Sequence, residues 1–223
     1  MKTIEMNKKR ISIFFFLAVL LLTVVSCSAG HYRYEEILDF PKSPLHASML
    51  GIPDSLATAE EWADVTVEGV LEDDGQPFYR FPTLPEEWSS RVSWQAPMSG
   101  STISTLRVTR VLGGTGDVKP GDRISIYEPY YVYDNADGVS TLYYYAHYLP
   151  AEPGEKYLFF LTENAYGNLA VGNEGMRFPL PDAQARSAAS IDALTAEDLY
   201  LAEGVDLESY KALYREVLEA YAE

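Results

Sequence analysis

Cys27 is the only cysteine in this 223-residue sequence, and it lies where a long uncharged stretch ends. Ile11–Val25 comprises 15 residues without a charge, and only Ser26 separates this stretch from the cysteine. A thiolate is a soft nucleophile that can be alkylated. Because a single cysteine cannot form a disulfide within its own chain, the position of Cys27 favours modification of the thiol.

The segment before Cys27 has the layout of a secretory signal. Four basic residues, all within residues 2–10, precede the uncharged stretch. As a helix that stretch would span about 22 Å, less than the roughly 30 Å hydrocarbon core of a bilayer. It therefore favours a cleaved signal over a membrane-spanning helix.

The sequence VVSC, which ends at Cys27, resembles the lipobox of bacterial lipoproteins. The resemblance implies cleavage before the cysteine, a diacylglycerol thioether on its sulfur, and a cell-membrane protein that faces away from the cytoplasm. Two acyl chains, at about 0.8 kcal/mol per buried CH₂, hold a soluble domain on a bilayer. The alternatives are an ordinary signal peptide with a chance cysteine and an uncleaved signal anchor.

Tyrosines on both sides of the sequence DNADG form a second candidate site. Tyr131 and Tyr133 precede this turn-like sequence, and Tyr143 and Tyr145 follow it. Alternate residues of a strand share one face, so each pair lies on one side of its strand. On a solvent-facing ribbon the four rings would form a stacking surface for sugar rings or an extended peptide. The alternative is that they form cross-strand pairs that stabilise a hairpin.

Other reactive groups lack the spacing of known sites. His31, His46 and His147 show no pattern typical of zinc ligands, and the sequence contains no nucleophile elbow, glycine-rich phosphate loop or Ser-x-x-Lys motif. If DNADG were a calcium loop, Tyr133 and Tyr144 would stand where acidic ligands are required. We therefore expect a hairpin turn there, and neither a metal nor a cofactor.

The charge of the chain limits its partners. After loss of residues 1–26, 13 basic and 32 acidic residues remain, which gives a net charge of −19. Such a chain is a poor partner for nucleic acid. The charge either attracts cations and basic peptides or keeps the protein soluble. Two classes of function remain: a non-catalytic module that binds a protein, a peptide or a cell-wall glycan, and an extracellular hydrolase that uses paired carboxylates in a cleft.

Strands are the main elements that the sequence predicts. Alternating or short apolar stretches occur at 63–72, 101–112, 123–133, 139–149, 156–162, 169–172 and 176–180. Glycine, proline, asparagine and aspartate separate them, a pattern typical of an all-β sandwich or a small barrel. Residues 63–72 are expected to form a half-buried strand, and 78–94 a long loop or an irregular edge hairpin. Pro-Gly at 120–121 and again at 153–154 indicates two type II turns rather than a duplicated unit.

Helices are expected toward the two ends of the chain. Residues 34–40 suit a short helix or an edge strand, and 52–63 a short helix capped by Asp54 or Ser55. Thr195 and Asp198 resemble a capping box that opens a helix ending at Gly204.

The last helix is expected to begin after Asp206 and to carry one apolar stripe. Residues 156–162 are apolar on both faces, so they need a cover. Either the C-terminal helix or the helix near Trp62 would supply it. Alternatively, the stripe binds a partner in trans.

Four segments follow from these patterns. They are a lipoprotein signal peptide at 1–26, a tether with a short helix at 27–62, a β-barrel domain at 63–182 and a helical segment at 183–223 that packs on the barrel.

Strand and turn sequences between about 64 and 180 also carry a resemblance. The stretches ADVTVEGV, RVLGG, PGDRISIY, PGEKYLFFL and GNEGMRFPL are similar to a loosely defined group of uncharacterised secreted and lipid-anchored proteins of Firmicutes. The resemblance implies a small OB-like or netrin-like β-barrel without an established activity. The chain lacks the disulfides of netrin-like inhibitors and the basic groove of nucleic-acid-binding OB modules.

Overall fold

β-strands dominate the computed structural model, which describes residues 32–45, 51–83, 96–180 and 188–221. Cys27, His31, His46 and residues 84–94 of the loop or edge hairpin expected at 78–94 lie outside the described residues. The strands are β1 (Lys42–Leu45), β2 (Val65–Leu71), β3 (Gln76–Arg80), β4 (Ser99–Gly114), β5 (Arg123–Glu128), β6 (Tyr130–Asp134), β7 (Ser140–Tyr145), β8 (Lys156–Glu163), β9 (Leu169–Val171) and β10 (Arg177–Pro179). The helices are α2 (Tyr34–Asp39), α3 (Leu56–Trp62), α5 (Ala188–Ala193), α6 (Leu207–Tyr221) and the short 3₁₀ helices η1 (Glu174–Met176) and η3 (Glu197–Leu199).

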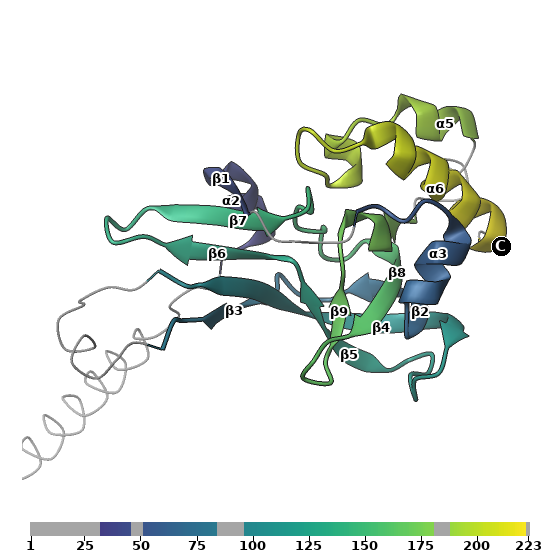
Figure 1. Cartoon of the computed structure of the whole chain (residues 1–223), viewed down its shortest axis with the longest axis horizontal. Helices are drawn as coiled ribbons and strands as arrows, with labels where there is room; N and C mark the ends of the chain where they lie inside the picture. Colours follow the sequence, from purple (N-terminus) through teal and green to yellow (C-terminus); the bar gives the residue numbers. More distant parts are fainter. Residues whose placement is uncertain (1–31, 46–50, 84–95, 181–187, 222–223) are drawn as a thin grey trace, which may run out of the picture. The chain divides into compact units, whose positions relative to one another are not determined.

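Five of the described strands form a small, partly closed ring in the order β8-β2-β4-β5-β9-β8 (Figure 1). Four of these pairings are antiparallel, and β5 meets β9 in parallel through the single pair Tyr127 and Ala170. Numbered along the chain, the ring strands follow one another as 1-2-3-5-4-1, the connectivity of an OB-like barrel. The expected mainly β fold with a small barrel is therefore confirmed.

A second sheet has the order β1-β7-β6; its β6 and β7 are inserted between the third and fourth strands of the ring, and its β1 precedes the first. Residues 123–133 were expected as one strand, but Pro129 separates β5 from β6, which lie in different sheets. Proline has no N–H for a sheet ladder, so a central strand ends or bends there. The β6–β7 connection is the expected hairpin turn: Asn135 Oδ1 accepts hydrogen bonds from the N–H groups of Asp137 and Val139, both at 2.9 Å.

β2 is buried on both faces, so the expectation of a half-buried strand is wrong. It lies between β4 and β8, and its outward-facing Glu68 forms ion pairs with Arg110 and Lys156 from those two neighbours. The guanidinium of Arg110 also donates to the carbonyl of Tyr221 at the end of α6. The buried carboxylate on the outer face of the strand is therefore paired with two basic side chains, as burial of charge requires.

α6 covers the barrel as its stripe predicts. Its rings Tyr210 and Tyr214 lie 5.1 and 5.5 Å from Phe178 of β10, and Phe178 contacts Phe160 of β8 at 6.1 Å. α3 also packs against β8, so both helices proposed as covers contribute (Figure 1). The alternative that this stripe binds a partner in trans is wrong, because its central residues are buried within the chain.

Helix ends follow the predicted caps with one exception. Ser55 caps α3 by accepting the N–H of Thr58 at 3.3 Å. Thr195 and Asp198 form the reciprocal bonds of a capping box at 2.7 and 3.2 Å. However, this box opens only the three-residue η3 and not a helix that reaches Gly204. The residue after η3, Tyr200, has a φ of +57°.

No helix in the described ranges is both long and apolar enough to cross a bilayer.

Residues 27–62 were expected to form a tether with one short helix. Their described part contains three elements, α2, β1 and α3, and all three pack against the rest of the chain. Residues 34–39 form a helix rather than an edge strand, and its Ile37 belongs to the core. β1 pairs with β7 in parallel, and α3 packs on β8. Among the described strands β3 pairs only with β4 and so forms an edge, as expected for the first part of the irregular hairpin.

Candidate functional site

A cleft of about 770 Å³ lies beside the contact between β5 and β9, which is limited to the single residue pair Tyr127 and Ala170. Its walls are β3 with the first residues of β4, the end of β5, and the loop 164–168 between β8 and β9. Small-molecule sites typically measure roughly 300–1,000 Å³. The cleft therefore has the size of a ligand site, and it results from the incomplete closure of the ring.

Exposed apolar side chains gather at this cleft. Among the described residues, four of the six exposed large apolar side chains line it: Phe78, Phe81, Met98 and Tyr166. Met98 is 71% exposed, Tyr166 65% and Phe81 46%. Scattered single apolar residues are normal on a surface, whereas a cluster marks a place of interaction.

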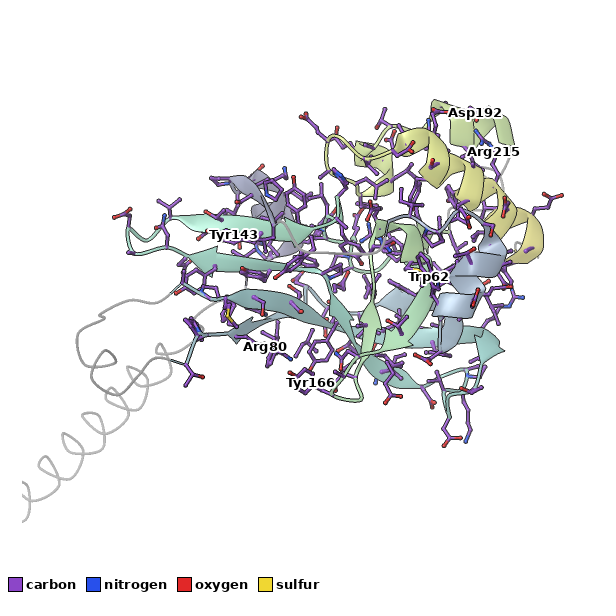
Figure 2. The ribbon with its side chains drawn as sticks, in the orientation of Figure 1. Trp62, Arg80, Tyr143, Tyr166, Asp192 and Arg215 are labelled. Carbon is purple, nitrogen blue, oxygen red and sulfur yellow. The ribbon has the colours of Figure 1, made fainter. Side chains whose placement is uncertain are left out.

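Arg80 and Tyr166 form a cation–π pair at the cleft. The guanidinium carbon lies 4.2 Å from the ring centroid, with Arg80 contributed by β3 and Tyr166 by the loop after β8 (Figure 2). The loop is held by Asn164, whose side chain accepts the N–H groups of Tyr166 at 2.9 Å and Asn168 at 3.2 Å. Tyr166 is therefore presented by an ordered turn, and Arg80 stacks on it.

Glu128 is the one carboxylate among the described residues that line the cleft. It is buried and accepts hydrogen bonds from the hydroxyls of Ser104 and Tyr148, the latter at 2.6 Å. Burial raises the pKa of Glu128, while these two hydrogen bonds act in the opposite direction. Both carboxylate oxygens are thus already engaged, and the described lining supplies no second carboxylate for general acid–base chemistry.

Arg177 is buried and stacks on Tyr148, the residue that donates to Glu128. Its guanidinium carbon stacks 4.0 Å from the ring centroid of Tyr148, and its two terminal nitrogens donate to the carbonyls of Leu149 and Tyr200 at 2.8 and 2.9 Å. Tyr148 therefore links the buried carboxylate to the buried guanidinium. Sequence reasoning missed this cluster, and its one available signal was a basic residue inside the apolar stretch 176–180.

The four predicted tyrosines belong to one face of the second sheet, because each strand contributes two residues that are two positions apart. Tyr131 is paired with Tyr143, and their rings stack at 5.2 Å. Tyr133 lies on the same face, 5.3 Å from the ring of Tyr79 of β3. Tyr131 is only 2% exposed, so the expectation of a solvent-facing ribbon is wrong for this residue. The reason is that β3 and the start of β4 cover this face.

Tyr145, the fourth predicted tyrosine, reaches the cleft. It belongs to the cleft lining, and its hydroxyl accepts the N–H of Gly100 at 3.4 Å. The second sheet therefore supports one wall of the cleft. Tyr79 helps to join the two sheets by donating from its hydroxyl to the carbonyl of Val132 at 2.5 Å, and burial raises the pKa of Tyr79 to about 12.

His147 packs beside the backbone and not in a ligand cluster. Its Nδ1 lies 3.1 Å from the carbonyl oxygen of Glu203. Within the described ranges, no three histidine, cysteine, aspartate or glutamate side chains group as metal ligands would.

Comparison with known proteins gives no family to which the chain can be assigned. No protein-family model matches it, and no curated protein matches it in sequence. The geometry of the cleft is therefore the basis for a functional conclusion.

Proposed function

We propose that this chain is a non-catalytic binding module that a lipid on Cys27 anchors to the cell membrane, facing outside the cytoplasm. The single observation that carries the binding function is the concentration of exposed apolar side chains at the cleft. The anchor rests on the uncharged stretch and the VVSC sequence.

The place of the cleft in the fold supports a binding role. OB-like barrels bind ligands on the face of their second and third strands, between the loops that join strands 1–2 and 4–5. Here those strands are β4 and β5, and the loops are the segment that contains β3 and the turn at 164–168. Because a fold alone does not confer a function, the argument rests on the side chains found there.

The ligand class follows from charge and location. A net charge of −19 after signal cleavage argues against the basic groove that nucleic acid requires. A module held at the outer face of a membrane meets proteins, peptides and cell-wall glycans. The hydrolase alternative is weaker, because Glu128 has no carboxylate partner among the described residues of the cleft.

Binding is tested with two matched double variants of the full chain. Phe81→Ser with Met98→Ser removes exposed apolar groups at the cleft, and Val111→Ser with Val139→Ser removes exposed apolar groups elsewhere. Each is mixed with a cell-wall digest and with detergent-solubilised envelope protein from the producing cells. We expect the first pair to lose a ligand that the wild type and the second pair retain. Equal retention by both pairs, with both folded, would contradict a binding role for the cleft.

The anchor has its own test. Cys27→Ala should abolish labelling by radioactive fatty acid and release the chain from the membrane, because no thiol then remains to carry the lipid. Labelling that persists in the variant would refute the assignment.

A further inference from the structure

Arg80 differs from every other arginine in the described part of the chain. The other six, Arg33, Arg107, Arg110, Arg123, Arg177 and Arg215, each donate a hydrogen bond to a carboxylate or a carbonyl. Arg80 contacts the ring of Tyr166 and donates to no oxygen among the described residues. A guanidinium without a described acidic partner is unexpected in a chain with so large an excess of acidic residues. Figure 2 shows the contrast with Arg215, which lies beside Asp192.

Stacking on Tyr166 leaves the N–H donors of the Arg80 guanidinium available to bind an anion. A guanidinium that lies over an aromatic ring keeps its five N–H donors in its own plane, where they match the two oxygens of a carboxylate. The ring also limits the positions that the long arginine side chain can take. Arg80 is therefore a preorganised donor at the edge of the cleft.

The rest of the lining suits an apolar group joined to amides. Phe78, Tyr127 and Met98 offer apolar surface close to Arg80 in the same cleft. Ser101 and Asn168, also in the lining, carry side chains that can donate to and accept from a peptide backbone. Because Glu128 is engaged with Ser104 and Tyr148, no described acidic group in the lining is free to oppose an incoming anion.

We propose that the cleft binds the carboxyl end of a peptide whose terminal residue is apolar, with Arg80 holding the terminal carboxylate. This inference rests on the proposed function, since it names the ligand class of the same cleft. A fatty acid would match the guanidinium and the apolar surface but would leave the polar side chains of the lining unused.

Three probes separate the parts of this proposal. They are N-acetyl-Ala-Phe with a free carboxylate, the same dipeptide as its C-terminal amide, and hexanoate. Binding to the full chain in an uncharged detergent is measured by calorimetry. We expect the free acid to bind at least about tenfold more tightly than the amide, because a bidentate charged hydrogen bond is lost in the amide. We expect hexanoate to bind more weakly than the free acid.

Two variants assign the effect to Arg80. Arg80→Gln should abolish the preference for the acid over the amide. Arg33→Gln makes the same change of charge at an arginine outside the cleft lining and should leave the preference intact. Both side chains are exposed, and far-ultraviolet circular dichroism establishes that each variant is folded.

The outcomes distinguish this inference from the proposed function. Equal affinity of the wild type for the acid and the amide would overturn the proposal that Arg80 holds a carboxylate. The proposal that the cleft binds apolar groups would still stand. Hexanoate binding as tightly as the free acid would overturn the choice of a peptide. If no probe binds, the inference falls, and the paired serine variants decide separately whether the cleft binds an envelope ligand.

Discussion

Gly100 shows how a single residue allows the two sheets to pack. A Cβ atom built there would lie 2.5 Å from Cδ1 of Tyr131, closer than carbon atoms can approach. The absent side chain lets the Tyr131 ring lie on the backbone of β4, and that ring in turn stacks on Tyr143. The buried face of the tyrosine hairpin thus depends on one small residue in a neighbouring strand.

Gly100→Ala should lower the free energy of unfolding by about 1–3 kcal/mol, because the Tyr131 ring must move or the strand must shift. Gly113→Ala is the matched control in the same strand, since its Cβ would meet nothing within 4 Å. Urea unfolding of the two variants and the wild type measures the difference. Equal stability of the two alanine variants would contradict the packing described here.

Glu128 makes stability depend on pH. Burial raises its pKa above the ordinary value of 4.5, so the folded chain keeps this proton at pH values where the unfolded chain has lost it. Its contribution to stability is therefore complete below pH 4.5 and is lost as the pH rises through the folded pKa.

Glu128→Gln removes this titration, and comparison with the wild type isolates it from the other carboxylates. We expect the free energy of unfolding of the wild type, minus that of the variant, to fall as the pH rises above 4.5. The slope should not exceed about 1.4 kcal/mol per pH unit. Urea unfolding at a series of pH values gives both curves. A difference that rises with pH would show that the folded pKa is lowered instead.

At the scale of elements, local sequence patterns predicted most of the fold. Alternation predicted β4, the steps of three and four predicted α6, and the Pro-Gly pairs predicted turns in which Gly121 and Gly154 have positive φ. These features depend on neighbours within a few residues, which the sequence displays directly.

Contacts between distant parts of the chain could not be predicted in the same way. The burial of both faces of β2 and the covering of Tyr131 depend on which strands become neighbours. The pairing of Arg80 with Tyr166 depends on the closure of the ring. Periodicity within one strand states which residues share a face, but it does not state what covers that face.

The packing of α6 on the core can be tested by shortening one buried side chain, Leu213, which belongs to the core cluster. Leu213→Ala should lower the free energy of unfolding by about 2–5 kcal/mol, because it removes buried methyl groups and leaves a cavity. Leu213 is 2% exposed, whereas Glu219 on the same helix is exposed. Glu219→Ala should therefore change stability by less than about 0.5 kcal/mol. Thermal and urea unfolding compare the two, and a small effect of Leu213→Ala would mean that α6 is not a cover of the barrel.

In the whole molecule, the expected signal sequence determines where the barrel and its cleft meet a ligand. The sequence before residue 28 predicts a position at the outer face of a membrane, and the barrel presents one cleft with an apolar lining among the described residues. The chain carries a large net negative charge, whereas the cleft contains a cation, Arg80, that has no acidic partner among the described residues. We infer that the ligand is captured close to the membrane by a surface unlike the rest of the protein.

Photo-crosslinking in the producing cells tests this account most directly. A benzophenone amino acid at Met98, the most exposed of the apolar side chains at the cleft, is compared with the same group at Val111, which is exposed outside the cleft lining. The account predicts an adduct at position 98 that Phe81→Ser weakens, and no corresponding adduct at position 111. An adduct of equal yield at both positions, or none at position 98 in correctly located protein, would contradict it.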